Sequence, residues 1–207
     1  MSAAGRHAAR SAGTNPRLFL AVDPPAETRR RAAAIIGQLQ AAGLSVRWVE
    51  PAALHLTLHF LGDCVPEQRL PEVCAVVDAA AAACRPFAVT FGGVGVFPPR
   101  GRPRVLWLGV TAGADDLKNL HGVLAKGLTQ LGFAVEQRPF QPHLTLGRLP
   151  TGFPGRHRPS QPVADAVKSL AAVPAGSGQI ERVTLFASLL NPAGAVHHPL
   201  HTAALSG

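Results

Sequence analysis

The spacing of apolar and polar residues predicts alternating strands and helices from Arg17 onwards. Short apolar or alternating runs that end at Gly, Pro or Asp are typical of strands. Apolar positions that repeat every three or four residues are typical of amphipathic helices. The expected strands cover residues 17–22, 46–51, 54–62, 86–93, 104–110, 142–149 and 180–190. The expected helices cover residues 27–42, 67–84, 115–131 and 163–172, and Pro71 leaves the start of the second one open.

This order of elements indicates one domain with two similar lobes. Residues 1–16 are rich in Ala, Gly, Ser and Arg without periodicity, so we expect a disordered tail there and a single bilobal domain over residues 17–207. The tetrad His-Leu-Thr-Leu occurs twice, at the start of the first phrase (residues 55–60, HLTLHF) and of the second phrase (residues 143–148, HLTLGR). The flanking residues agree only loosely, which favours two related lobes whose phrases face each other.

Each phrase is expected to sort its residues between the two faces of a strand, because side chains alternate along it. The residues expected on the core side are Leu56, Leu58, Phe60, Leu144 and Leu146. The residues expected on the opposite side are His55, Thr57, His59, His143 and Thr145. Each phrase therefore presents an imidazole and a hydroxyl from a rigid strand, and Gly147 leaves space beside the second pair.

Two such strands facing each other would form an acid–base site for a phosphodiester. Hydrolysis of a cyclic phosphate needs a base that takes a proton from water and an acid, on the opposite side, that protonates the departing oxygen. Histidine suits both tasks because its pKa of about 6.5 allows either protonation state near neutrality. The threonine hydroxyls can donate hydrogen bonds to the phosphate oxygens. This arrangement requires no metal and no cofactor.

Two other interpretations of the phrases are less consistent with the sequence. A single histidine on a strand is ordinary as a surface or core residue, but a repeated tetrad is difficult to attribute to composition. A zinc pair on a helix would use His55 and His59, yet the glutamate of the His-Glu-x-x-His motif is replaced by Leu56 and the apolar period is two.

Composition and charge narrow the class of protein. The chain has 207 residues, 47% of them hydrophobic, and it has neither a long apolar run nor a signal-like start, so we expect a cytoplasmic protein without a membrane span. Three cysteines without a Cys-x-x-Cys pair favour free thiols. A formal net charge of +8 favours polyanionic partners such as RNA.

Several segments resemble a known family. These are RLFLAVDPP, WVEPAALHLTLHFLGD, PRVLWLGV, RPFQPHLTLGRL and VTLFASLLNPAGAVHHPL, which together span Arg17 to Leu200. They are similar to the two-histidine (2H) phosphoesterases, and specifically to the RNA 2',3'-cyclic phosphodiesterases, also known as 2'-5' RNA ligases. The resemblance implies an α+β fold of two pseudo-symmetric lobes, each an antiparallel sheet with flanking helices, around a central cleft.

The resemblance also implies roles for individual residues. His55 would donate the proton to the leaving 3' oxygen, and His143 would be the base that activates water. Thr57 and Thr145 would hold phosphate oxygens. The substrate would be RNA with a 2',3'-cyclic phosphate terminus, the product a 2'-phosphomonoester, and ligation through a 2'-5' linkage a side activity. The residues alone leave the acid and base assignment open, because the two phrases are too alike.

Two further residues are candidates for substrate binding. Arg148 matches an arginine that the family places at the substrate, although strict alternation turns it toward the leucine face unless a strand end or a bulge at Gly147 redirects it. Phe140 is a candidate for stacking on a base, and its alternative role is to fill the core.

Other functions stay open at this point. One is an RNA-binding module without physiological turnover, although a pure binder would need neither a second imidazole nor its threonine. Another keeps the chemistry and changes the substrate to a small cyclic nucleotide or an ADP-ribose cyclic phosphate. No heptad pattern or exposed apolar stripe indicates association, so we expect a monomer without a protein partner.

Overall fold

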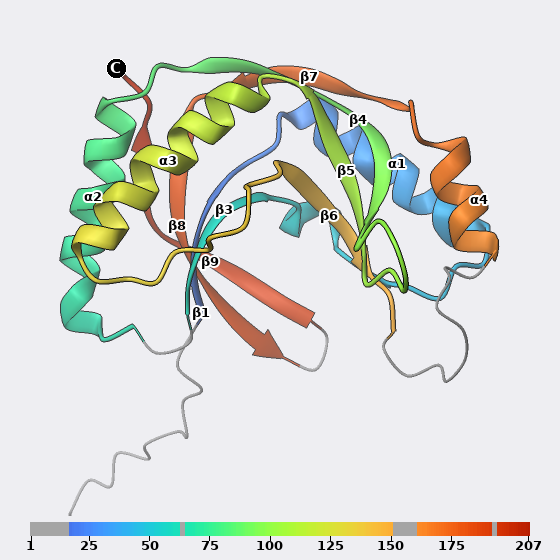
Figure 1. Ribbon diagram of the computed structural model, residues 1–207, viewed down its shortest axis with the longest axis horizontal. Coiled ribbons are helices and arrows are strands. Elements are labelled where there is room, and N and C mark those ends of the chain that lie inside the picture. Colours follow the sequence, from blue (N-terminus) through green and yellow to red (C-terminus); the bar gives the residue numbers. More distant parts are fainter. Residues whose placement is uncertain (1–16, 63–64, 151–160, 192–193) are drawn as a thin grey trace, which may run out of the picture.

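Two antiparallel sheets and four α-helices make up the computed structural model, which describes residues 17–62, 65–150, 161–191 and 194–207 (Figure 1). The strands are β1 Arg17–Val22, β2 Arg47–Trp48, β3 Leu56–Gly62, β4 Phe87–Phe97, β5 Val105–Ala112, β6 His143–Arg148, β7 Pro174–Ile180, β8 Arg182–Asn191 and β9 Gly194–Ala204. The helices are α1 Ala26–Ala41, α2 Leu70–Ala82, α3 Ala114–Gln130 and α4 Gln161–Ser169, with short 3-10 turns η1 Pro51–Ala53 and η2 Glu67–Arg69. The expected tail and most of the loop after β6 lie outside the described residues.

The two sheets divide the chain in an unexpected way. The first sheet has the strand order β3-β1-β8-β9 and therefore uses both ends of the described chain. The second sheet has the order β2-β6-β5-β4-β7 and uses the middle. The first phrase thus belongs to an edge strand of one sheet and the second phrase to an inner strand of the other, and β3 and β6 lie side by side at the centre (Figure 1). The predicted two-lobed α+β architecture is confirmed.

Helices cover only the outer face of each sheet. In Figure 1, α2 and α3 lie outside the first sheet, and α1 and α4 lie outside the second. The leucines of α3, which repeat at intervals of three and four residues, are fully buried against the first sheet; they are Leu117, Leu120, Leu124 and Leu128. The opposite side of each sheet, which we call its helix-free face, looks toward the other lobe.

Two strands were not expected from the sequence. Glycines in β7 argue against a strand, but a Cβ on Gly178 would lie 2.7 Å from the Cβ of Pro25, so glycine allows the start of α1 to approach this strand closely. Pro199 argues against β9 for a different reason, since proline cannot donate to a ladder. It is tolerated because β9 is the edge of its sheet and the register with β8 shifts there.

The predictions of free cysteines and of no membrane-spanning helix can be compared with the described residues. Cys74 and Cys84 are free thiols, and Cys64 lies outside the described part of the chain. Within the ranges that the structure covers, no helix is long and apolar enough to cross a membrane.

Candidate active site

Both phrases contain a register shift at the same place, the second leucine of the tetrad. In the first phrase, Thr57 lies opposite Ala21 and His59 lies opposite Leu20, so Leu58 has no partner of its own. In the second phrase, Leu146 likewise lies between two residues that pair with adjacent positions of the partner strand, β5, and has no partner of its own. Such a bulge reverses the alternation of all residues that follow it.

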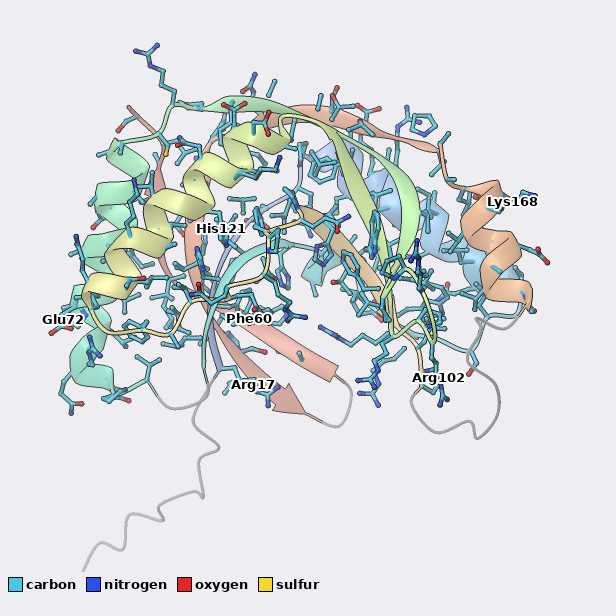
Figure 2. All side chains as sticks on the ribbon, viewed as in Figure 1. Arg17, Phe60, Glu72, Arg102, His121 and Lys168 are labelled. Atoms are coloured by element: carbon cyan, nitrogen blue, oxygen red, sulfur yellow. The ribbon has the colours of Figure 1, made fainter. Side chains whose placement is uncertain are left out.

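The bulge changes the faces predicted for the end of the first phrase. His59 was expected beside His55, but it faces the helix layer and is only 4% exposed. Phe60 was expected in the core, but it lies opposite Phe19 on the helix-free face and is 67% exposed (Figure 2). Both predictions were wrong because strict alternation was assumed through Leu58.

His59 belongs to a stack of three rings instead. Its imidazole lies on that of His121 of α3 with ring centroids 4.0 Å apart, and its Nε2 donates to the main-chain oxygen of His121 at 2.8 Å. Phe140 covers the other side of His121 at 4.2 Å and is half-buried. Packing thus occupies one side of the Phe140 ring, and its suggested role in base stacking stays a prediction.

The same bulge brings Arg148 to the helix-free face. Thr145 lies opposite Trp107, and Arg148 lies opposite Val105, two residues before Trp107 on β5. Because residues two apart on a strand share a face, and cross-strand partners do too, Arg148 projects to the side that carries Thr145. Gly147 faces the other way, where a Cβ would lie 2.5 Å from Val46, so only glycine allows β2 to approach there.

Each phrase histidine is held by the carbonyl oxygen two residues before it. Nδ1 of His55 is 2.8 Å from the oxygen of Ala53, and Nδ1 of His143 is 2.8 Å from the oxygen of Gln141. A carbonyl can only accept, so Nδ1 carries the proton in both rings. In the neutral ring Nε2 is then free to accept a proton, and in the charged ring it is free to donate one. Both imidazoles can therefore transfer a proton through Nε2.

Arg29 stabilises the turn that orients His55. Its guanidinium donates to the carbonyl oxygens of Pro51, Ala52 and Leu54 at 2.8, 3.1 and 3.0 Å, and also to the carboxylate of Asp23 at 3.0 Å. These carbonyls flank that of Ala53, which holds His55. Sequence inspection did not identify Arg29, because the contact joins the first turn of α1 to η1.

Aromatic rings surround His55. The ring centroid of Phe19 is 4.8 Å away, that of His197 is 4.9 Å away and nearly perpendicular, and that of Phe186 is 6.4 Å away. Burial lowers the pKa of His55 from 6.5 to about 4, against the hydrogen bond to Ala53, which raises it. The charge of His197 lowers this pKa further, and Asp23 opposes that effect.

His143 has a different neighbourhood on the second sheet. Phe97 lies 5.0 Å from its ring centroid and Trp107 lies 6.4 Å away. Burial lowers the pKa of His143, the hydrogen bond to Gln141 acts in the opposite direction, and the positive charge of Arg148 lowers the pKa further. Arg148 is thus close enough to His143 for its charge to disfavour protonation of that imidazole.

The two threonines and two arginines supply donors on the same faces. Thr57 and Thr145 are half-buried, and within the described residues neither hydroxyl has a hydrogen-bond partner from the protein. Arg47 of β2 pairs with Arg148, and both side chains are exposed. Arg102, at the end of the β4–β5 hairpin, lies across from Phe60 in Figure 2. An anion between the sheets would meet hydroxyls and guanidinium groups as well as imidazoles.

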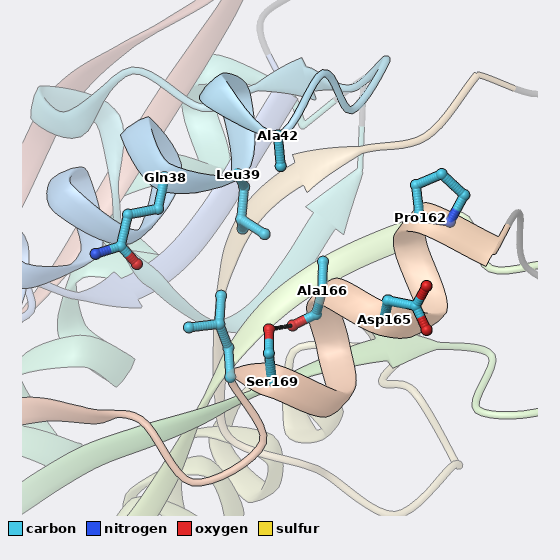
Figure 3. A pocket seen from close by; sticks show the side chains of 8 residues that line it. Gln38, Leu39, Ala42, Pro162, Asp165, Ala166 and Ser169 are labelled. Carbon is cyan, nitrogen blue, oxygen red and sulfur yellow. Dashed lines mark hydrogen bonds between the residues drawn. The ribbon is translucent and has the colours of Figure 1, made fainter.

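Two cavities differ in their relation to this site. One, of about 410 Å³, is lined by Trp107, Phe140 and Gln141 and lies beside His143. The other, of about 430 Å³, lies between α1 and α4 on the outer side of the second sheet (Figure 3). Its one ionisable lining residue among those described is Asp165, so it offers no acid–base pair. Within the described ranges, no three His, Cys, Asp or Glu side chains are grouped to hold a metal ion.

Comparison with known proteins shows which family this chain belongs to. The family model for LigT like phosphoesterases matches twice, at residues 22–107 and at residues 108–197, so that each match contains one phrase. The chain belongs to the LigT-like phosphoesterase family. The family implied by the sequence is therefore confirmed, and the double match agrees with the duplication inferred from the phrases.

Individual members of the LigT-like phosphoesterases resemble this chain over nearly its full length. An RNA 2',3'-cyclic phosphodiesterase of Archaeoglobus fulgidus is 35% identical over 185 residues, which cover 89% of this chain and 97% of that protein. The crystal structure of TT0787 of Thermus thermophilus has a TM-score of 0.76 at 30% identity and covers 92% of this chain and 98% of that one. The crystal structure of E. coli LigT complexed with 3'-AMP has a TM-score of 0.69 at 25% identity, with 93% and 99% covered.

Proposed function

We propose that this chain hydrolyses RNA ends that carry a 2',3'-cyclic phosphate and releases a 2'-phosphomonoester. The observation that carries the proposal is the pair of imidazoles on neighbouring strands, each fixed through Nδ1 so that Nε2 is free. The name of the Archaeoglobus fulgidus relative supports the substrate, since almost the whole of that protein is matched. The net charge of +8 on this chain favours an RNA ligand.

In the proposed reaction, the two histidines transfer protons in opposite directions. Nε2 of neutral His143 takes a proton from water, and the water oxygen forms a bond to phosphorus. The bond from phosphorus to the 3' oxygen breaks, and Nε2 of protonated His55 gives that oxygen its proton. The products are a 2'-phosphomonoester and a 3'-hydroxyl, and a second proton transfer between solvent and the two rings restores the enzyme.

Polar groups on the helix-free faces would stabilise the charge that grows on the phosphate oxygens. Thr57 and Thr145 would each donate one hydrogen bond, and Arg148 would add a charge-assisted contact. Side chains of this chain thus supply both the proton transfers and the charge stabilisation, and we propose that the reaction proceeds without a metal ion.

Nearby charges favour the acceptor role of His143 and act in both directions on His55. Burial lowers the pKa of His55 most, His197 and Arg29 also lower it, and the carboxylate of Asp23 raises it and so favours the charged, donating form. The guanidinium of Arg148 lowers the pKa of His143 and so favours the neutral, accepting form. Burial outweighs Asp23 in the free protein, and a bound phosphate anion would favour protonation of His55 again.

The bases of the RNA would contact the aromatic side chains near the histidines. Phe60 is the best placed for stacking, because it is exposed and lies on the same face as Phe19 and His55. Phe140 remains a second candidate beside the cavity next to His143.

The reverse reaction would follow from the same groups. If a 5'-hydroxyl replaces water, His143 takes its proton, the 5' oxygen bonds to phosphorus, and the 3' oxygen leaves with the proton of His55. The product is a 2'-5' linkage. No nucleotide cofactor is required, because the cyclic phosphate already contains the bond that is exchanged.

The decisive assay combines a defined substrate with two variants. Purified protein is incubated, in EDTA, with a short RNA that ends in a 2',3'-cyclic phosphate, and the 2'- and 3'-phosphate products are separated. We expect the wild type to give the 2'-phosphate, and His55→Ala and His143→Ala to lose about 10² to 10⁴ in rate. His198→Ala is the matched control, since His198 is exposed and lies on the other face of β9.

The same assay separates the alternatives. Turnover that survives the loss of either histidine would contradict the two-histidine mechanism. If neither the wild type nor the variants turn over the RNA while both variants lose affinity for it, the chain is an RNA-binding module. Faster hydrolysis of a small cyclic nucleotide or an ADP-ribose cyclic phosphate than of the RNA would change the substrate and keep the mechanism.

A further inference from the structure

A third histidine, His197 of β9, contacts the imidazole of His55. The two ring centroids are 4.9 Å apart and their planes meet at 86°. His197 is also nearly perpendicular to Phe19, at 5.0 Å and 79°. Its partner across the ladder is Ser188, two residues after Phe186, which stacks on Phe19, so the ring projects from β9 to the helix-free face of the first sheet.

His197 differs from the two phrase histidines in how it is held. His55 and His143 each donate through Nδ1 to a carbonyl two residues earlier. Nδ1 of His197 is buried and has no hydrogen-bond partner among the described residues. Among the described residues, no carbonyl thus holds Nδ1 of His197 as one does in the phrase histidines, and its ring contacts Phe19 and His55.

We propose that His197 is a positioning residue of the reaction, which acts through His55 by holding its imidazole against Phe19 and by placing a second ionisable ring against it. This proposal rests on the proposed function for its effect on turnover, but not for the effect on His55 itself. The geometry carries it, because Phe19, His55 and His197 form a closed group of three mutual ring contacts of 4.8 to 5.0 Å. Removal of any one ring opens a gap beside the other two.

The charges around His55 support the second half of the proposal. Four groups face it from the surrounding elements: the carbonyl of Ala53, His197 on β9, Asp23 after β1 and Arg29 on α1. His197 and Arg29 lower the pKa of His55, while the Ala53 carbonyl and Asp23 raise it. Burial, followed by His198, lowers the pKa of His197 itself. A proton on His197 therefore makes a proton on His55 less favourable, and protonated His55 becomes a stronger acid.

The test measures His55 directly by NMR titration of isotope-labelled histidine rings, with its signal assigned by its absence in His55→Gln. His197→Phe keeps a ring in place and removes the ionisable group, and His197→Ala removes both. We expect the pKa of His55 to rise by about half a pH unit or more in both variants, as like charges about 5 Å apart predict even in a watery medium. His201→Phe, whose side chain contacts Asp78 of α2 on the helix side of the same strand, should leave this pKa unchanged.

Kinetics then separate positioning from packing. We expect His197→Ala to lower kcat about tenfold or more, since a displaced His55 would no longer be aligned, while KM stays within about twofold. His197→Phe should restore most of kcat and shift the alkaline side of the pH profile upward, because His55 must be protonated to act as the donor. Thermal unfolding of each variant verifies that the fold is retained.

Two results would overturn the role proposed for His197, and a third would contradict the proposed function alone. An unchanged pKa of His55 in His197→Phe would overturn the proposal. A loss in His197→Phe that appears in KM would overturn it too, because His197 would then bind substrate itself. A raised pKa of His55 in a protein that does not hydrolyse the cyclic phosphate would support the contact and contradict the proposed function.

Discussion

The two phrases use the same backbone arrangement in two different neighbourhoods. In both, a carbonyl two residues earlier fixes the histidine, and a bulge at the second leucine returns the sixth residue to the face of the histidine. That sixth residue is Phe60 in one phrase and Arg148 in the other. The comparison indicates that duplication supplied the histidine, the threonine and the bulge, and that the sixth position was free to diverge.

The residues that surround His55 differ from those that surround His143. His55 lies among Phe19, Phe186 and His197, and its preceding turn is stabilised by Arg29. The second phrase has the charge of Arg148 within reach of its histidine. Aromatic rings line both histidines, since Phe97 and Trp107 lie beside His143, and the second side adds the cation of Arg148.

The largest effect outside the histidines is expected from the loss of the cation. Arg148→Gln should lower kcat/KM by roughly 10- to 100-fold, because a hydrogen bond to a charged group contributes about 1.5 to 3 kcal/mol. Steady-state kinetics on the cyclic-phosphate RNA would measure it. Lys168→Gln on the outer helix α4 removes the same charge as a control (Figure 2). Equal rates for the two variants would show that Arg148 does not contact the substrate.

A smaller effect is expected from the aromatic side. Phe60→Ala should raise KM about tenfold, since stacking on a base contributes about 1 to 3 kcal/mol, while Phe60→Tyr should leave KM nearly unchanged. Thermal stability should hardly change, because Phe60 is 67% exposed. Leu200→Ala is the control, as another exposed apolar residue of the first sheet. A large loss of stability in Phe60→Ala would mean that the ring serves packing instead.

The smallest effect concerns stability rather than activity. The folded-state pKa is lowered for His55, His59, His121, His143 and His197. Between about pH 6.5 and about pH 4 the unfolded chain therefore binds more protons than the folded one, and the free energy of unfolding falls as the pH falls. A buried histidine such as His59 contributes at most about 1.4 kcal/mol per pH unit. The contributions of the half-buried His55, His121, His143 and His197 are smaller.

Urea unfolding at pH 7 and pH 5 would measure this dependence and compare the two phrases. His55→Gln should reduce the difference between the two pH values more than His143→Gln does, because the pKa of His55 is lowered as far as about 4. A protein that becomes more stable on acidification would contradict the assignment of these histidines as neutral in the folded state.

The strongly periodic parts of the fold could be predicted from the sequence, and the irregular parts could not. The leucines of α3 and the alternation of the tetrads are local patterns, and they gave the correct elements. The bulge in the second phrase had a signal, Gly147 inside a strand, whereas the first phrase contains no glycine before its shift. The face of Phe60 was therefore assigned wrongly. His197 and Arg29 act through contacts between distant segments, which no local pattern reveals.

Replacing the leaving atom of the substrate tests whether the twin histidines transfer protons in opposite directions. A cyclic substrate with sulfur in place of the bridging 3' oxygen releases a thiolate, which does not need a proton to depart. We expect His55→Ala to regain most of the wild-type rate on this substrate, while His143→Ala stays inactive because water still needs its base. Recovery of His143→Ala alone, or of neither variant, would contradict the assignment.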